Sequence, residues 1–325
     1  MIEDVAIIPL ADRERWTSAQ QCEGLPGQAW SYAHALEATG IEPQLAVVRA
    51  GGARMLLPFF ERDWHGHRDI ATMLGLSGAS VSPPSAAPLA LWAEFAAARG
   101  WVAGYLHFGN ELPSMPSDLA TSLSTHTVYE LDLTLDDPFA VASAIVRRKL
   151  RKAEANGVEL VDAPEALEAA LPRLYREAAW RQGASNAYAL PDETLHRWIR
   201  APDILALGAR VAGKVEAISL FPFTGKRGEF HINASTDAGR VLSTWLIREA
   251  ANRLARRGVA SLNIGGGLEV GDSLDHFKAR FQGSPRQVHT IGQIYDRPRY
   301  EALCEQAGAD PHMPGWFPAY RRSVE

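Results

Sequence analysis

Residues 204–237 constrain the fold more than any other part of the chain. They read ILALGARVAGKVEAISLFPFTGKRGEFHINASTD, three strand-like runs separated by turn residues at Gly213-Lys214 and at 225–228. This spacing predicts three consecutive antiparallel strands. An amphipathic helix over 240–258 follows, because apolar residues recur at every fourth position and a glycine ends the pattern. The next strand-like run leads into a triple glycine.

Strand and helix patterns alternate over the rest of the chain as well. The clearest hairpin spans residues 44–62, where two apolar runs meet at Gly51-Gly52. Helix patterns that end at a glycine cover residues 27–40 and 84–100. The alternation predicts an α/β (α+β) protein, and a length of 325 residues favours two domains.

Composition excludes several classes of protein. A net charge of -5 argues against general coating of nucleic acid, although it permits a local basic site. Cys22 and Cys304 lie too far apart in sequence to suggest a disulfide framework or a metal motif. No apolar run reaches the roughly 20 residues that a bilayer span needs, and the start of the chain does not resemble a signal peptide. We therefore expect a cytoplasmic protein without metal and without integral membrane contact.

A basic helix is predicted over residues 136–157. Five of its six residues from 147 to 152 are cationic, and Arg148, Arg151 and Lys152 share one face at 100° per residue. Such a face suits phosphates or an RNA backbone. A solvated face with cations near the helix end, where they interact well with the helix dipole, explains the same pattern.

The triple glycine Gly265-Gly266-Gly267 suggests a phosphate loop, but its spacing excludes the two common types. Gly267 is followed by Leu268 rather than by the lysine of a Walker A motif, and the GxGxxG fingerprint is also absent. A loop that allows close approach, with Lys278 and Arg280 beyond it, is still compatible with the sequence. A purely structural role is equally compatible.

The segment EFHINAS places Glu229, His231 and Asn233 on one side of a strand. This polar side indicates either an exposed face or the wall of an active site. No GxSxG elbow or activated cysteine accompanies it, so the sequence offers no protein nucleophile.

Three segments together resemble a known family. In chain order they are RRKLRKAEANGVELV, GEFHINASTDAGRVLSTWLIREAANRLARRG and LNIGGGLEVGDSLDHFKARFQG. They resemble the Fem-type branch (FemA, FemB and FemX) of the GNAT-fold transferases, most specifically over about residues 146–283. The resemblance implies two tandem GNAT-like domains with a cleft between them. The N-terminal domain is expected over residues 1–137, with 297–325 packing back on it, and the C-terminal domain over residues 138–296.

The resemblance also implies an activity. Fem-type enzymes transfer an aminoacyl group from aminoacyl-tRNA to an amine and so form an amide or peptide bond. The expected partners are the acceptor end of aminoacyl-tRNA, as co-substrate, and an amine on a small molecule or a peptidoglycan-type peptide. No other cofactor is implied. The chain shows no long helical hairpin of the kind some relatives carry, which leaves room for a small soluble acceptor.

Site residues follow from the same resemblance. Lys278, beside Phe277, is expected near donor phosphate or the developing negative charge, and His231 and Asn233 are expected to position the reactants. The residues expected to bind the donor are Arg148, Arg151, Lys152, Gly265, Gly266, Gly267 and Arg280. Those expected to bind the acceptor are Trp30, Tyr32, Glu229 and Asp272.

Two alternatives stay open. GNAT proteins that use acyl-CoA hold its pyrophosphate on a turn with two glycines, whereas the matching segment here has only Gly239, followed by Arg240 and Val241. The bulky side chains disfavour an acyl-CoA donor without excluding it. The second alternative is a non-catalytic module that keeps the GNAT fold for binding.

Overall fold

The computed structural model describes residues 3–20, 24–73, 75–109, 122–181, 189–267, 269, 271–312 and 316–322. The chain forms two compact units. Unit 1 comprises Met1–Trp30, Ile41–His126 and Gln287–Glu325, and unit 2 comprises Ser31–Gly40 and Thr127–Arg286. Cys22 lies outside the described residues, and Cys304 is a buried free thiol in unit 1.

Unit 1 is built on a sheet with the strand order β1-β2-β3-β4-β6-β14, and β5 pairs with β3. The strands are β1 (Asp4–Pro9), β2 (Gln44–Ala50), β3 (Ala53–Trp64), β4 (His67–Thr72), β5 (Ser80–Ser82), β6 (Ala103–Phe108) and β14 (Ser284–Ile294), whose first residues belong to unit 2. The helices are α1 (Arg13–Gln20), α3 (Ala87–Ala98) and α9 (Arg297–Gln306), with the first residue of α2 (Trp30–Leu36).

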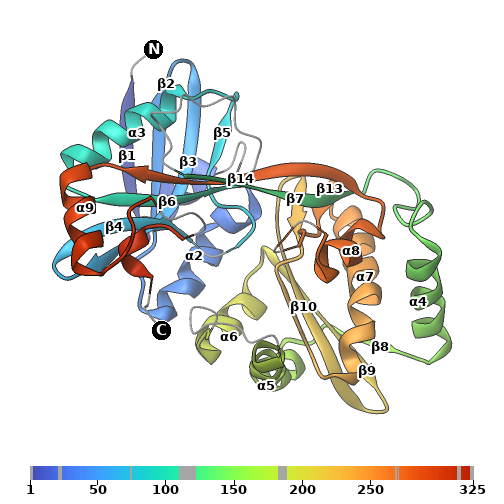
Figure 1. Ribbon diagram of the computed structural model, residues 1–325. Helices are drawn as coiled ribbons and strands as arrows, with labels where there is room; N and C mark the ends of the chain where they lie inside the picture. Colours follow the sequence, from blue (N-terminus) through green and yellow to red (C-terminus); the bar gives the residue numbers. More distant parts are fainter. Residues whose placement is uncertain are drawn as a thin grey trace. The chain divides into compact units, whose positions relative to one another are not determined.

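The predicted hairpin of unit 1 is confirmed. Strands β2 and β3 pair in antiparallel register from Gln44↔Phe59 to Ala50↔Ala53. Gly51 and Gly52 both have positive φ, at 57° and 79°, as a tight two-residue turn requires. Helix α3 packs on β1, β2 and β3 (Figure 1) and buries Trp92 in the core.

Unit 2 has the strand order β7-β13-β11-β10-β9-β8, and β12 pairs with β10. Its strands are β7 (Ser122–Asp132, of which the first residues belong to unit 1), β8 (Glu159–Val161), β9 (Ile204–Val211), β10 (Lys214–Thr224), β11 (Arg227–Glu229), β12 (Ile232–Ser235) and β13 (Ser261–Asn263). Its helices are the rest of α2, α4 (Ala144–Ala155), α5 (Pro164–Arg181), α6 (Asp192–Arg200), α7 (Ser243–Arg256) and α8 (Ser273–Ala279).

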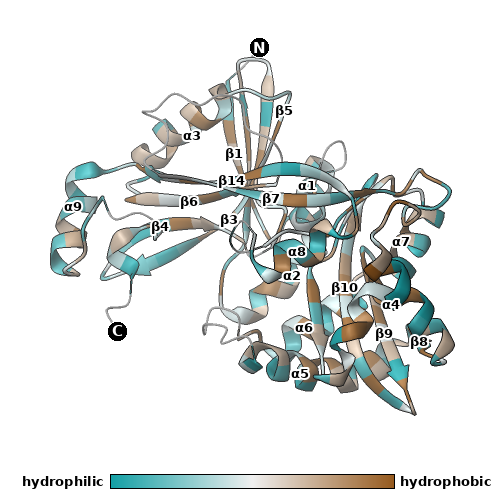
Figure 2. Ribbon diagram, turned by 45° about the vertical axis from the view of Figure 1, so that its right-hand side comes forward, coloured by the Kyte–Doolittle hydropathy of each residue, from teal (hydrophilic) through white to brown (hydrophobic). Residues whose placement is uncertain are grey.

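Helices cover both faces of the unit 2 sheet. The side chains of Leu205 and Leu207 join the core on which α4 and α7 pack. Gly208, which points the other way, lies so close to Leu167 of α5 that an added Cβ would stand 2.8 Å from it. Strand residues alternate in direction, so α4 and α7 cover one face while α5 and α6 cover the opposite one (Figure 1). Figure 2 shows the hydrophilic, basic residues along α4 in teal.

The predicted antiparallel strands over residues 204–237 form, but the third is broken into β11 and β12. Strand β11 pairs in parallel with β13, from Arg227↔Ser261 to Glu229↔Asn263. At the break, the Phe230 amide donates to the carbonyl oxygen of Asn263 (2.8 Å) and the His231 amide donates to that of Leu220 on β10 (3.0 Å). The chain thus leaves β13 at the break, and β12 has β10 as its only strand partner among the described residues.

Candidate functional site

The break at Phe230 and His231 is the centre of the candidate site. Phe230 belongs to the core on the α7 face of the sheet, while the ring of His231 contacts Trp198 of α6, on the opposite face. Two groups of predicted site residues therefore meet the break from different sides. Lys278 lies on the Phe230 side, and Tyr32 lies on the His231 side.

Lys278 is a buried cation surrounded by aromatic rings. It is 4 % exposed, and its Nζ lies 3.9 Å from the centre of the Phe230 ring and 5.5 Å from that of Phe277. Phe277 is held in turn by an edge-to-face contact with Phe281, at 5.4 Å between centroids. No carboxylate and no hydrogen-bond acceptor of the described residues contacts Nζ. Burial therefore lowers the pKa of Lys278 well below its ordinary value.

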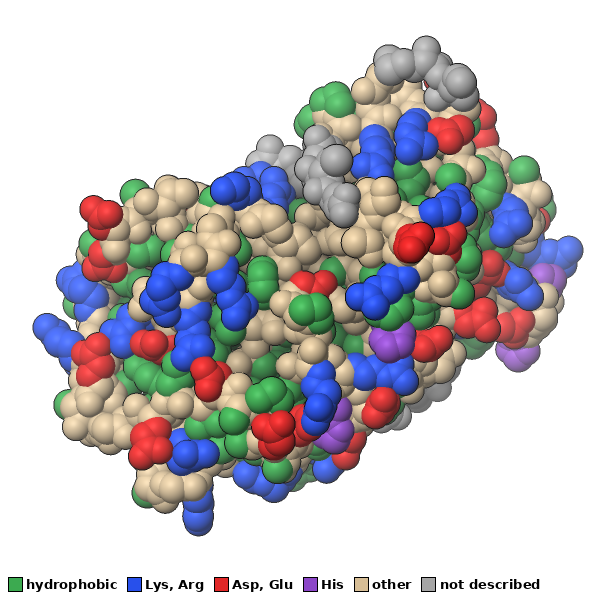
Figure 3. Space-filling model, turned by 180° about the vertical axis from the view of Figure 1, so that it is seen from behind, with side chains coloured by type: hydrophobic (Ala, Val, Ile, Leu, Met, Phe, Trp, Pro, Cys, Tyr) green, Lys and Arg blue, Asp and Glu red, His purple; other side chains and the backbone are tan. Residues whose placement is uncertain are grey.

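A second lysine, Lys149, lies beside Phe277 and has two arginines near it. The half-buried Lys149 of α4 places its Nζ 5.5 Å from the centre of the ring. Burial, and then the positive charges of Arg280 and Arg148, lower the pKa of Lys149. None of these three cations forms an ion pair with a described acidic residue. Over much of the face shown in Figure 3, basic and acidic side chains are intermixed. Cations without an acidic partner beside a buried lysine differ from this pattern, and such a site is suited to binding an anion.

Arg151 and Lys152 continue this basic surface of α4. Both are exposed, whereas Val146, Leu150 and Ala153 are buried on the inner side of the helix. The helix begins at Ser143, whose Oγ accepts from the Val146 amide. The cap and the apolar stripe thus fix which residues of the basic run face outward.

The triple glycine is required by close packing of the backbone. Gly265 has φ of 75°, a left-handed conformation. A Cβ on Gly266 would lie 1.8 Å from the carbonyl oxygen of Thr127, and one on Gly267 would lie 2.5 Å from Asp272 Oδ1. Of the two roles that the sequence left open, these contacts favour the structural one.

Asp272, predicted to bind the acceptor, caps helix α8. Its Oδ1 accepts from the Asp275 amide (2.7 Å) and its Oδ2 from the Glu269 amide (3.1 Å). Asp275 accepts from the hydroxyl of Tyr129 on β7 (2.9 Å), which ties the start of α8 to the sheet. The glycine loop and this cap together hold the helix that carries Lys278.

His231 lies in an aromatic cluster on the other side of the break. Its Nε2 is 2.9 Å from the hydroxyl of Tyr32, and its ring meets Tyr32 and Trp198 edge-on. Tyr32 stacks on Trp198 at 5.1 Å, and both are almost completely buried. Burial, and secondly the negative charge of Glu229, raise the pKa of Tyr32 well above its ordinary value. Burial lowers the pKa of His231 to about 4, so the imidazole is neutral at pH 7.

The depressed pKa of His231 predicts a dependence of stability on pH. The unfolded chain, with a histidine pKa of 6.5, binds the proton more tightly than the folded chain, so stability is complete above pH 6.5 and is lost as the pH falls towards 4. The loss is at most about 3 kcal/mol, because each pKa unit corresponds to about 1.4 kcal/mol. Urea unfolding from pH 7.5 to 4 checks this. His231→Gln, which cannot titrate, should flatten the curve; equal pH dependence in both proteins would contradict the prediction.

Two further predicted residues, Asn233 and Trp30, have other partners. Asn233 on β12 accepts a hydrogen bond from the hydroxyl of Ser219 on β10 (3.0 Å). Trp30 lies in unit 1, where its Nε1 donates to the carbonyl oxygen of Leu10 (2.8 Å) and Arg13 lies over its ring. Of the four residues predicted to bind the acceptor, Tyr32 contacts His231, and Glu229 is close enough to Tyr32 to affect its pKa.

Three residues of the site were not predicted from sequence. Phe230 alternates with the polar residues of EFHINAS, which indicates only that it points to the other side of the strand, and no motif includes Trp198. Lys149 belongs to the basic run but not to the face formed by Arg148, Arg151 and Lys152. Membership of that basic run was the only sequence signal that could have indicated Lys149.

The segment in which an acyl-CoA-dependent GNAT protein would carry its pyrophosphate loop packs against strand β10. Gly239 packs on β10 so closely that a Cβ would lie 2.0 Å from the carbonyl oxygen of Glu216. Its amide donates to the hydroxyl of Thr236 (3.0 Å). Local packing thus explains the single glycine of this segment.

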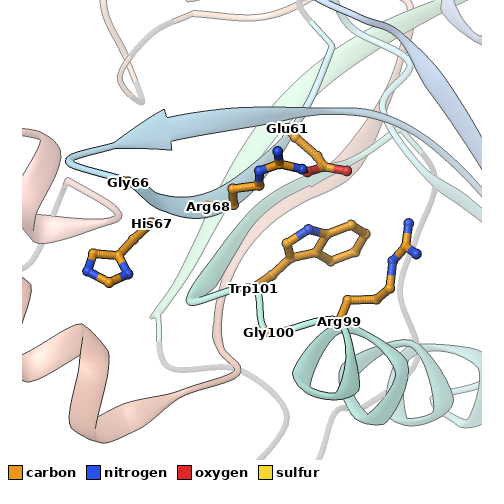
Figure 4. A pocket seen from close by; sticks show the side chains of 7 residues that line it. All are labelled: Glu61, Gly66, His67, Arg68, Arg99, Gly100 and Trp101. Carbon is orange, nitrogen blue, oxygen red and sulfur yellow. The ribbon is translucent and has the colours of Figure 1, made fainter.

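Unit 1 contains a pocket of about 390 Å³ beside the β3–β4 hairpin (Figure 4). Its lining residues are Glu61, Gly66, His67, Arg68, Arg99, Gly100 and Trp101. Arg68 and Glu61 pair across it at 2.8 Å, and none of the predicted site residues lines it.

Within the described ranges, no group of three or more His, Cys, Asp or Glu side chains could hold a metal ion. None of the helices in those ranges is both long and apolar enough to cross a bilayer.

No protein-family model and no curated protein matches the sequence. Solved structures do match the fold. FemX has a TM-score of 0.67 at 11% identity, over 92% of this chain and 99% of that one. The C-terminal domain of a proposed lysylphosphatidylglycerol synthetase from Agrobacterium fabrum has a TM-score of 0.56 at 13% identity, over 94% and 98%. L-PGS from Bacillus licheniformis has a TM-score of 0.52 at 13% identity, over 81% and 88%.

These similarities establish the fold. The chain has the fold of FemX, as the three sequence segments predicted, and its two mixed α/β units agree with the predicted fold class. At 11–13% identity the solved structures say nothing further of the chemistry. The cleft between the two domains stays a prediction.

Proposed function

We propose that this protein is an acyltransferase that forms an amide by moving an aminoacyl group from aminoacyl-tRNA to an amine on a small molecule or peptide. The observation that carries the proposal is the buried, acid-free setting of Lys278 at the strand break. A buried cation without a partner is costly to keep. A ligand that brings negative charge to it would explain its presence.

The proposed amide formation requires few protein groups besides Lys278. The ester of an aminoacyl-tRNA is already activated, so an amine can attack it directly if the oxyanion that forms is stabilised and one proton is removed. The N–H donors of Lys278 are suited to that oxyanion and to the departing 3′ oxygen. Removal of a single oxyanion donor costs about 3 kcal/mol in other enzymes, which sets the scale for this lysine.

The donor is proposed to lie along the unpaired cations. Lys149 lies beside Phe277, with Arg148 and Arg280 close enough to Lys149 to act on its pKa, and these three cations would meet the phosphates nearest the reactive end of the tRNA. Arg151 and Lys152 extend the same basic surface. On the other face, Tyr32, Glu229 and His231 are proposed to fix the position of the break.

Binding of the donor tests this assignment. The double variant Arg148→Ala/Arg280→Ala should weaken the affinity for charged tRNA and lower the slope of log K against log salt by about 1.4, since each phosphate contact with a single strand contributes about 0.7. Filter binding between 50 and 300 mM salt measures the slope. The control is Arg173→Ala/Arg176→Ala on α5, where both arginines already pair with acids. A slope unchanged from that of the control would remove these cations from the donor site.

An acyl-CoA donor remains the alternative substrate. The close packing of Gly239 on β10 and the exposed Val241 leave no double-glycine turn for a pyrophosphate in this segment. This favours the tRNA donor.

A further inference from the structure

The proposed reaction needs a base that removes a proton from the acceptor amine, and the surroundings of Lys278 bear on which group this is. Its amino group is the most enclosed cation of the site, 4 % exposed and 3.9 Å from the centre of the Phe230 ring. The charged groups on the elements around it are Lys149 and Arg148 of α4, Arg280 at the end of α8, and Glu229 of β11. Burial alone lowers the pKa of Lys278; none of these charges offsets it.

In this buried setting the uncharged amine of Lys278 is favoured over the charged ammonium. Contact with aromatic faces returns only part of the stabilisation that an ammonium loses when it leaves water. Without a counter-ion that loss stays large even after the protein relaxes. No described residue accepts a hydrogen bond from Nζ, so no protein acceptor offsets that cost. The rings therefore do not compensate fully for the lost water.

We propose that Lys278 enters the reaction as an uncharged amine and serves as its general base. This rests on the proposed function. The acceptor nitrogen attacks the ester carbonyl, a C–N bond forms and the carbonyl electron pair moves to oxygen. The nitrogen passes its proton to Lys278 Nζ, and the new ammonium stabilises the oxyanion beside it. The C–O bond to the 3′ oxygen then breaks, and that oxygen takes the proton from Nζ, which restores the uncharged amine.

The other basic side chains at the break are less suited to this role. His231 has a pKa of about 4, its Nε2 is engaged with the Tyr32 hydroxyl, and it lies on the opposite face of the sheet from Lys278. Lys149 is only half-buried, and its Nζ lies no closer to Phe277 than that of Lys278, at 5.5 Å from the centre of the ring. Lys278 is thus the base that the geometry favours.

Two measurements test the proposal. The chain has five lysines, Lys149, Lys152, Lys214, Lys226 and Lys278, so 13C labelling at lysine Cε gives a simple NMR spectrum. The Lys278 signal, assigned by its loss in Lys278→Met, should have the chemical shift of an uncharged amine at pH 7. The chemical shift of an ammonium at pH 7 would overturn the proposal, and this readout does not depend on activity.

The second measurement compares Lys278→Arg with Lys278→Met in amide formation from charged tRNA. Arginine keeps a positive charge at every accessible pH, so it can replace a cation but not a base. We expect both variants to lose about 10²-fold or more; recovery of a tenth or more of the wild-type rate by Lys278→Arg would overturn the base role. Full activity in both variants would instead contradict the proposed site as a whole.

Discussion

Lys278→Met should lower the rate of amide formation by about 10²–10³-fold, the range found when an oxyanion donor is removed. The side chain is the only one at the break that combines full burial, aromatic contacts and the absence of an acid among the described residues. Methionine fills a similar volume without a charge. Single-turnover transfer from saturating charged tRNA measures the effect on the chemical step.

The same substitution should leave the fold intact. Replacing a buried amino group that has no acceptor among the described residues by an apolar side chain of similar size removes a desolvation cost, so the unfolding free energy should stay equal to that of wild type or rise. Lys214→Met, at an exposed lysine of the same unit, is the matched control and should change neither quantity. A stable Lys278→Met protein with the wild-type rate would show that the lysine has no part in the reaction.

Asp69→Ala should reduce the free energy of unfolding by about 3–5 kcal/mol, the cost of removing one partner of a buried ion pair. Asp69 is completely buried on β4. Its Oδ1 accepts from Arg62 Nε (2.6 Å), and its Oδ2 accepts from Arg321 Nε (2.6 Å) and from the Tyr320 hydroxyl (2.9 Å). The variant leaves two guanidinium groups and a buried phenol without their acceptor.

Urea unfolding of the whole chain provides the measurement for Asp69. Asp4→Ala serves as the control, because the exposed Asp4 pairs with Arg49 at 3.2 Å on the surface, where such pairs contribute at most about 1 kcal/mol. Asp69 fastens the C-terminal residues 320 and 321 to the β3–β4 hairpin, so limited proteolysis should also release this end faster in the variant. Equal stability losses in the two variants would contradict the account of this network.

Local patterns predicted much of the fold. The Gly51-Gly52 turn, the amphipathic helix α7 and the strands β9 and β10 all follow from residues close together in sequence, and each formed as expected. The placement of residues 31–40 in unit 2 depends instead on Tyr32 stacking on Trp198, more than 160 positions away. No local periodicity encodes such a contact.

The site was harder to predict for the same reason. The alternation of EFHINAS indicated one polar side, but the loss of pairing with β13 at the break, while pairing with β10 continues, depends on Asn263 and Leu220, which are distant in sequence. Lysines are usually solvated, so nothing in the sequence alone indicated that Lys278 is buried against Phe230. The glycine spacing did exclude the common nucleotide loops, and the structure adds why the glycines are needed: β7 and the cap of α8 approach too closely for a side chain.

A comparison of acyl donors tests the central claim most directly. A radiolabelled amino acid is supplied either on tRNA or as a matched acyl-CoA, with a panel of amines and with or without ribonuclease. The account predicts amide product from the charged tRNA, and its loss when ribonuclease is added. Product from acyl-CoA that persists after ribonuclease treatment, with none from charged tRNA, would contradict it.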